Sequence, residues 1–250
     1  MKLNHFVPLV LILFVNIKLA TGQNQSRVYD FPIKPGTKEW ESLGSYEEEL
    51  NAYNIPTELL KYMNTADLVR TCLDYPEFRL IMTRNSFQEG YDYLKSIFNG
   101  FRELERRKDV GAELIKEYKK LNPADIKNFD TPLKKGKFSF SIKYIEILLS
   151  QRPIIATMDN KNQVELLKLV ILNYNVIQKM PEDYATFGLM TPALVIARML
   201  DVISYQDFTT RKSVDNILRD FVDYSYGVDI NTLSDIISFA KAYLNQIENE

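Results

Sequence analysis

Histidine, cysteine and tryptophan each occur once in this chain of 250 residues. The single histidine is His5 and the single cysteine is Cys72. Most catalytic triads, general bases and zinc sites depend on imidazole or on paired thiolates. The scarcity of these side chains excludes the common catalytic constellations, so we assign no catalytic residue and expect neither a metal site nor a cofactor.

The first 22 residues have the pattern of a secretory signal peptide. Phe6 to Phe14 is apolar apart from Pro8, and it is too short to span a bilayer stably. Ala20 to Gly22 then supplies small residues before a cut at Gln23. We therefore expect a secreted or periplasmic mature chain.

Basic residues are neither in excess nor gathered into a block. Removal of Lys2 and Lys18 with the signal peptide leaves 29 of the 31 basic residues against 33 acidic ones, a net charge of −4. A chain that is weakly acidic and has no basic patch is not expected to bind nucleic acid. No later segment is long and apolar enough to predict a transmembrane span. The partners that we expect are a protein, a peptide or a glycan at the cell envelope.

Cys72 has no partner for a disulfide within the chain. It shares a helical stripe with Leu68, Val69 and Leu73. A lone cysteine in an exported protein is either intermolecular or buried, and cysteine is among the residues most often found in protein interiors. The stripe therefore predicts a buried thiol.

Residues 23–44 are predicted to form an extended N-terminal arm. Pro32 and Pro35 oppose a helix there, and Thr37 is placed to cap a single turn. Extended segments with alternating side chains can engage grooves or neighbouring chains. Three aromatic residues of this region are therefore our candidate binding residues: Tyr29, Phe31 and Trp40.

Helix start signals recur from Ser45 onward. Ser45 with Glu48, and Ser86 with Glu89, have the spacing of a capping box, and the second is predicted to open a long helix toward Arg107. Thr191-Pro192 combines a cap residue with proline at the first helical position.

Apolar residues at helical spacing follow these signals. Val214 to Val222 and Leu233 to Ile247 read as one-sided helices, whereas Val164–Ile177 and Ala193–Ile203 are apolar nearly all round, as in enclosed helices. Asn122 to Lys137 reads as a long connection between helices. We predict an all-α fold, an irregular helical bundle or short α-α superhelix of nine or ten helices, with residues 45–250 as one domain.

Three stretches carry a resemblance to a known group of proteins. They are Pro32 to Trp40 (PIKPGTKEW), Ile55-Pro56 and Leu68 to Pro76 (LVRTCLDYP). In these stretches the chain resembles exported all-helical proteins of Gram-negative gut-type bacteria, a family that has no assigned activity. The resemblance implies export and transfers no catalytic pattern.

Carboxylates are the remaining candidate catalysts, because glycoside hydrolysis needs only two of them. The glutamates at 47–49 lie at a predicted helix start, and we place the aspartates of the C-terminal part, including Asp201 and Asp223, on solvated faces or helix ends. Ser139 to Lys143 lacks the Ser-x-x-Lys spacing of penicillin-binding enzymes and reads as a polar helix start.

Aromatic residues also occur in a predicted loop, at Tyr184 and Phe187, which is the second candidate contact region. The hypothesis that we favour is a non-enzymatic exported scaffold or binding protein. The alternative is a histidine-free, carboxylate-dependent hydrolase that acts on glycan. A cleft with two facing carboxylates would favour the enzyme, and a shallow apolar groove would favour the binding protein.

Overall fold

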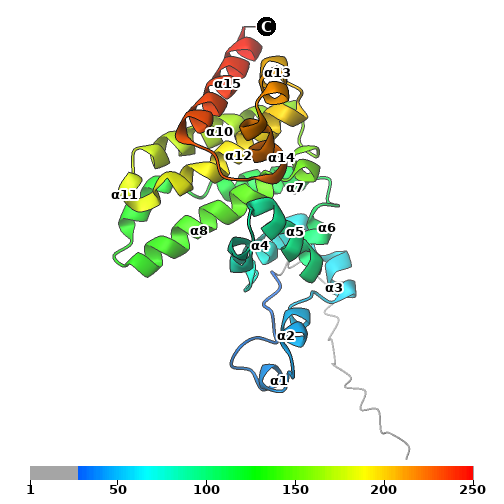
Figure 1. Ribbon diagram of the computed structural model, residues 1–250. Coiled ribbons are helices and arrows are strands. Elements are labelled where there is room, and N and C mark those ends of the chain that lie inside the picture. Colours follow the sequence, from blue (N-terminus) through cyan, green and yellow to red (C-terminus); the bar gives the residue numbers. More distant parts are fainter. Residues whose placement is uncertain (1–27, 250) are drawn as a thin grey trace, which may run out of the picture.

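The computed structural model describes residues 28–249 (Figure 1), so the predicted signal peptide lies outside the described residues. Regular secondary structure in this range is entirely helical, with fifteen α-helices and three 3-10 helices. The predicted all-α class is confirmed. The predicted number of nine or ten helices is too low, because several apolar stretches are divided into shorter helices.

The N-terminal half is built from short helices. In chain order they are α1 (Lys38–Glu41), α2 (Tyr46–Ala52), α3 (Thr57–Tyr62), α4 (Thr65–Leu73), η1 (Phe78–Thr83), α5 (Phe87–Ile97), α6 (Asn99–Leu104) and α7 (Val110–Tyr118).

The C-terminal half contains the three longest helices. Its elements are η2 (Pro123–Asn128), α8 (Pro132–Leu149), α9 (Arg152–Ile155), α10 (Asn160–Gln178), α11 (Pro181–Tyr184), η3 (Thr186–Leu189), α12 (Met190–Val202), α13 (Gln206–Val214), α14 (Asn216–Tyr224) and α15 (Ile230–Glu248). In Figure 1 the arm, α1 and α2 form one end of the molecule, and α13 and α15 lie at the opposite end.

Helix α12 forms the centre of the C-terminal half. Every residue from Thr191 to Leu200 is buried, and α12 packs against α8, α10 and α15. This confirms the enclosed helix predicted from Ala193 onward. Helix α10, by contrast, has one face in solvent, where Leu172 is 59% exposed. The prediction that this segment is enclosed on all sides is therefore wrong.

The predicted long helix from Ser86 is interrupted at Phe98, which has an extended backbone with φ −126° and ψ 122°. The next residue, Asn99, is held by the segment before α3. Its side-chain oxygen accepts from the Ile55 N–H at 2.9 Å, and its own backbone N–H donates to Asn54 Oδ1 at 2.8 Å. These tertiary hydrogen bonds take Asn99 out of a continuous helix, which is why α5 and α6 are separate.

The stripe predicted from Val214 to Val222 is also divided. Asp215 is extended, and its carboxylate caps α14 by accepting from the Leu218 N–H at 3.1 Å. Val214 and Ile217 are 75% and 55% exposed, so they do not face the core. The stripe of α15 does face it, because Leu233, Ile236, Ile237, Ala240 and Leu244 are buried as predicted.

Asn122 to Lys137 is more ordered than the long connection that we predicted. It contains η2 and the start of α8, where Thr131 accepts a hydrogen bond from the Lys134 N–H and Pro132 occupies the first turn. The buried apolar residues of the described chain form one cluster that extends from Phe31 to Leu244. The arm therefore contributes to the same core as the helices.

Candidate functional site

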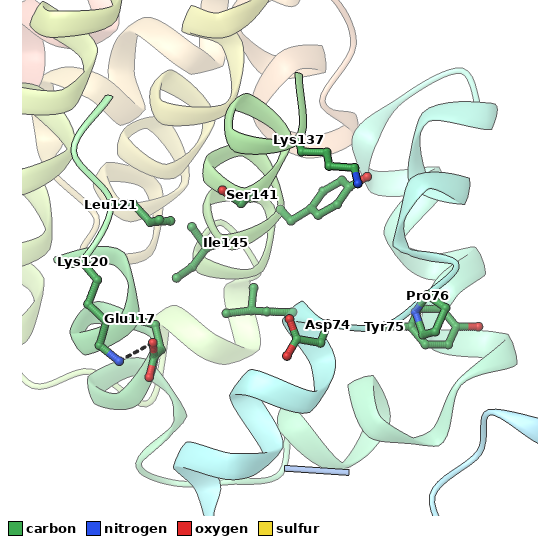
Figure 2. Close-up of a pocket in the computed structure, with 11 residues that line it drawn as sticks. Asp74, Tyr75, Pro76, Glu117, Lys120, Leu121, Lys137, Ser141 and Ile145 are labelled. Atoms are coloured by element: carbon green, nitrogen blue, oxygen red, sulfur yellow. Dashed lines mark hydrogen bonds and ion pairs between the residues drawn. The ribbon is translucent and has the colours of Figure 1, made fainter. Parts of the chain in front are cut away.

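A cleft of about 720 Å³ opens where the C-terminal ends of α4 and α7 meet the middle of α8 (Figure 2). Helix α4 ends at Leu73, and Pro76 follows shortly after and cannot continue a helix. Along α8, Ser141, Tyr144 and Ile145 lie three and four residues apart and therefore share one face. That face forms one wall of the cleft.

The floor of the cleft is largely apolar. By floor we mean three lining residues: Leu73 of α4, Ile145 of α8, and Leu121 in the connection after α7. Tyr144 adds a partly buried ring, which stacks on Phe78 with centroids 4.1 Å apart and an interplanar angle of 13°. The ring is therefore held in one orientation beside the cleft.

Two carboxylates line the cleft, and their environments differ. Burial, and then repulsion from Glu117, raise the pKa of Asp74 above its ordinary value. Burial would also raise the pKa of Glu117, but hydrogen bonds from Lys120 and Arg70 hold it below its ordinary value. The Nζ of Lys120 lies 2.5 Å from Glu117, and the Nε of Arg70 lies 3.1 Å from it.

Asp74 and Lys137 bring opposite charges to the cleft. Among residues 28–249, the side chain of neither residue makes a hydrogen bond or an ion pair. The cleft thus offers a carboxylate and an ammonium that are free to meet a ligand, together with an apolar floor.

The arm packs against the core beside this cleft. Phe31 is only 5% exposed, with φ +44°, and its ring contacts those of Tyr53 and Phe98 at centroid distances of 5.7 and 6.0 Å. The backbone N–H of Tyr29 donates to Thr71 Oγ1 on α4 at 3.0 Å. These contacts indicate that the arm covers part of the core.

Trp40 lies on the short helix that we predicted. Thr37 caps α1 by accepting from the Trp40 N–H at 3.2 Å, and the indole packs on Tyr53 with centroids 5.2 Å apart. A contact role for Tyr29, Phe31 and Trp40 stays a prediction, and their common feature in the structure is packing.

A smaller hollow of about 340 Å³ joins the arm to the cleft. Tyr29 and Phe31 line it together with Lys34. Asp74 and Pro76 line both this hollow and the cleft. The aromatic arm and the cleft are therefore neighbouring parts of one surface.

The second predicted contact region is divided between core and surface. Tyr184 is buried, and its hydroxyl donates to the carbonyl of Pro123 at 2.7 Å. Phe187 is 38% exposed, and the Nζ of Lys143 lies 4.3 Å from the centre of its ring. Only Phe187 of this pair is available to a partner.

A buried carboxyl group was not predicted. Glu146 is fully buried, and the hydroxyls of Tyr118 and Thr191 each lie 2.5 Å from one of its oxygens. The sequence suggested that Thr191 caps a helix, but α12 begins one residue earlier, at Met190, so Thr191 lies inside the helix and its hydroxyl donates to Glu146. Lys143, assigned to a polar helix start, is buried within α8 and lies close enough to affect the pKa of Glu146. In the sequence, Glu146 is the single glutamate in the apolar run after Lys143, and this position was the signal from which its burial could have been predicted.

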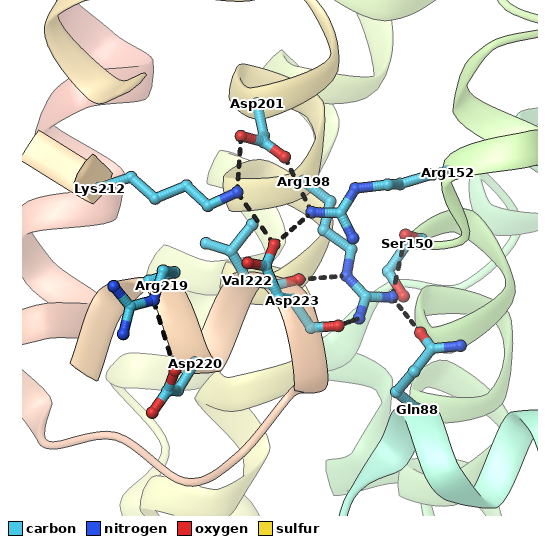
Figure 3. A network of polar contacts seen from close by, with 10 residues as sticks. All are labelled: Gln88, Ser150, Arg152, Arg198, Asp201, Lys212, Arg219, Asp220, Val222 and Asp223. Carbon is cyan, nitrogen blue, oxygen red and sulfur yellow. Dashed lines mark hydrogen bonds and ion pairs between the residues drawn. The ribbon is translucent and has the colours of Figure 1, made fainter. Parts of the chain in front are cut away.

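A ring of four charges joins the C-terminal helices (Figure 3). The Nη2 of Arg152 lies 2.8 Å from Asp201 and 2.8 Å from Asp223, and the Nζ of Lys212 lies 2.9 Å from each of them. Asp201 and Asp223 do lie at helix ends, in the last turns of α12 and α14, but their side chains are only 18% and 30% exposed and they are not spread apart as expected. They come together because α13 and α14 fold back on the end of α12.

The described residues contain no group of three or more His, Cys, Asp or Glu side chains placed to hold a metal ion. Within residues 28–249, no single helix has the length and hydropathy needed to cross a membrane. One bent pair, Thr186–Val202 with Gln206–Val214, meets that criterion by length and composition. Comparisons with known protein families, curated proteins and solved structures find no match to this chain.

Proposed function

We propose that this chain is an exported, non-enzymatic binding protein that holds a peptide or glycan partner in the cleft between α4, α7 and α8. The observation that carries the proposal is the composition of the cleft. Its volume of about 720 Å³, its apolar floor and its few polar groups are typical of ligand sites.

The individual groups of the cleft support this function. Tyr144 is fixed by stacking on Phe78, so a ligand that packs on it would lose little side-chain entropy. Asp74 and Lys137 can each hydrogen-bond a ligand without first breaking an ion pair within residues 28–249. The adjoining hollow at Tyr29 and Phe31 extends the same surface for a longer partner.

A variant that fills the cleft tests the proposal. Ser141 lines the cleft, and its hydroxyl donates only to the carbonyl of Phe138 within its own helix. Ser141→Trp should fill the cleft and abolish binding of labelled protein to peptide or glycan arrays. Ser213→Trp is the matched control, because Ser213 bonds the Thr210 carbonyl in the same way and is exposed on α13. Array binding that survives Ser141→Trp would reject the cleft as the site.

Export is the second part of the proposal, and it rests on the segment before Gln23. Intact-mass measurement on protein from the native host should give an N-terminus at or within a few residues of Gln23. A protein that retains Met1 would contradict export.

A second candidate function, a carboxylate-dependent hydrolase of glycan, has one observation in its favour. The pKa values of Asp74 and Glu117 are displaced in opposite directions within one cleft. Such a pair has the electrostatics of an acid and an ionised partner.

An assay for the release of reducing ends from cell-wall glycan distinguishes the two candidate functions. If the protein is a hydrolase, Asp74→Asn should reduce the rate by about 10²–10⁴-fold, as expected for loss of a general acid. The exposed Asp235→Asn is the control. The binding protein that we propose would release no reducing ends above background.

A further inference from the structure

Arg198 on α12 is a buried cation whose hydrogen-bond partners are all neutral. It is 1% exposed. Its Nε donates to the carbonyl of Val222 at 2.8 Å, and its Nη1 donates to Gln88 Oε1 at 2.6 Å. The carbonyls of Ser150 and Asp223 lie farther away, at 3.4 Å. Within the described chain, no carboxylate accepts a hydrogen bond from this guanidinium.

Arg198 adjoins the ring of four charges formed by Arg152, Lys212, Asp201 and Asp223 (Figure 3). The ring alone is balanced, since it holds two cations and two carboxylates. Arg198 makes a third cation. Its charge is offset only at longer range, by the carboxylates of Asp223, Asp92 and Asp201. Arg198 hydrogen-bonds none of these carboxylates, and a buried cation without a bonded carboxylate is costly.

The guanidinium groups of Arg152 and Arg198 repel one another. Burial lowers the pKa of Arg198 to about 10, and the charge of Arg152 contributes in the same direction. Arg198 remains protonated at neutral pH at that value. Two cations of this kind are stabilised when an anion lies between them.

Both arginines line a hollow of about 390 Å³. Arg152 uses only its Nη2 in the ring, so its Nε and Nη1 donate to no acceptor among residues 28–249. Gln88 and Tyr224 complete this part of the lining, and Tyr224 is 55% exposed. The hollow thus presents unused guanidinium donors beside a buried cation.

The other charges around the hollow form a separate group on and beside α5. The Nζ of Lys95 lies 3.7 Å from Asp92 and 3.3 Å from Glu105. Glu105 also accepts from the hydroxyl of Tyr91 at 2.9 Å. One lysine shared by two carboxylates leaves this group with a net charge of −1, so the charges that line the hollow balance overall. Neither carboxylate, however, hydrogen-bonds Arg198.

We propose that the hollow beside Arg152 and Arg198 binds a small oxyanion, a carboxylate or phosphate group. Guanidinium groups offer parallel N–H donors that match the oxygens of both. The hollow shares no lining residue with the α4–α7–α8 cleft, so this site is independent of the proposed binding function.

Thermal unfolding of the whole protein tests the site. Inorganic phosphate and acetate are compared with chloride at equal ionic strength. An anion at ten times its Kd should raise the melting temperature by about 3–6 °C. A response to phosphate alone identifies a free phosphate site, and a response to acetate identifies a carboxylate site. A melting temperature that follows ionic strength alone overturns the proposal.

Two variants locate the response. Arg152→Gln removes the more exposed guanidinium and should weaken binding of the anion by at least about tenfold. Arg219→Gln is the control, because Arg219 pairs only with Asp220 at 3.7 Å, outside the hollow. An unchanged response in Arg152→Gln would overturn the proposal.

A double variant that moves a carboxylate within the site tests the proposal even if Arg152→Gln does not fold. Gln88 accepts from Arg198, and its Nε2 donates to Asp92 at 3.1 Å. The double substitution Gln88→Glu with Asp92→Asn keeps the net charge and moves one carboxylate next to Arg198. It should abolish the anion response and raise the melting temperature in chloride, relative to Asp92→Asn alone. A double variant that still responds to the anion would overturn the proposal.

Discussion

Glu146 is a single carboxyl group enclosed by apolar helices, and its protonation changes near neutral pH. Burial raises its pKa to about 7, although hydrogen bonds from Thr191 and Tyr118 and the charge of Lys143 act in the opposite direction. The same burial lowers the pKa of Lys143. Stability should therefore depend on pH at this residue.

Folding takes up a proton at Glu146 between its ordinary pKa of 4.5 and the folded value of about 7. The contribution of the protonated group is complete below about pH 4.5 and is lost as the pH rises through 7. We expect a loss on the order of 3 kcal/mol between pH 4.5 and pH 8. Glu146→Gln should remove this part of the pH dependence.

Urea unfolding at several pH values measures the effect. The exposed Glu182→Gln serves as the control, since it should keep the wild-type profile. Identical pH profiles for wild type and Glu146→Gln would contradict the assignment.

Residue-level prediction from sequence succeeded where an apolar stripe set the environment. Cys72 is buried as its stripe predicted. Glu146 was missed because a charged residue in an apolar run gives no indication of its partners, which lie on α7 and α12.

At the scale of elements, local signals predicted helix starts well. Ser45 and Ser86 accept hydrogen bonds from the backbone of Glu48 and Glu89, which is the serine half of each predicted capping box. The glutamate carboxylates instead accept from the Gly44 N–H and from the side chain of Asn85. Helix ends and breaks were predicted poorly. The break at Phe98 depends on hydrogen bonds to residues more than forty positions away, which no local pattern contains.

The arm is the element whose role can be measured most directly. Phe31 lies among the rings of Tyr53, Tyr75 and Phe98, so Phe31→Ala should lower the free energy of unfolding by about 3–5 kcal/mol. Tyr29→Ala, at a half-buried position, should cost less. A stability change near zero for Phe31→Ala would show that the arm does not cover the core and would favour a contact role.

For the whole molecule, sequence reasoning predicted the all-α class and could not place the cleft. The class follows from repeated local periodicity. The cleft requires the ends of α4 and α7 to meet α8, and these elements are separated in the chain by others. The ring of charges was missed for the same reason, because it joins α9, α12, α13 and α14.

One core that includes the arm predicts one unfolding transition. Trp40 is the single tryptophan of the chain and reports on the arm, whereas circular dichroism reports on the helices. Urea transitions followed by the two signals should coincide. A fluorescence transition at lower urea concentration would mean that the arm detaches before the helices unfold.

The place of Phe31 in the core also sets an order of events during synthesis. Phe31 precedes every described helix, yet the rings that enclose it belong to residues that follow it, the last being Phe98. A nascent chain that stops short of Phe98 therefore leaves the arm open to proteases. Protection of the arm begins only when residues far behind it have left the ribosome and folded back over it.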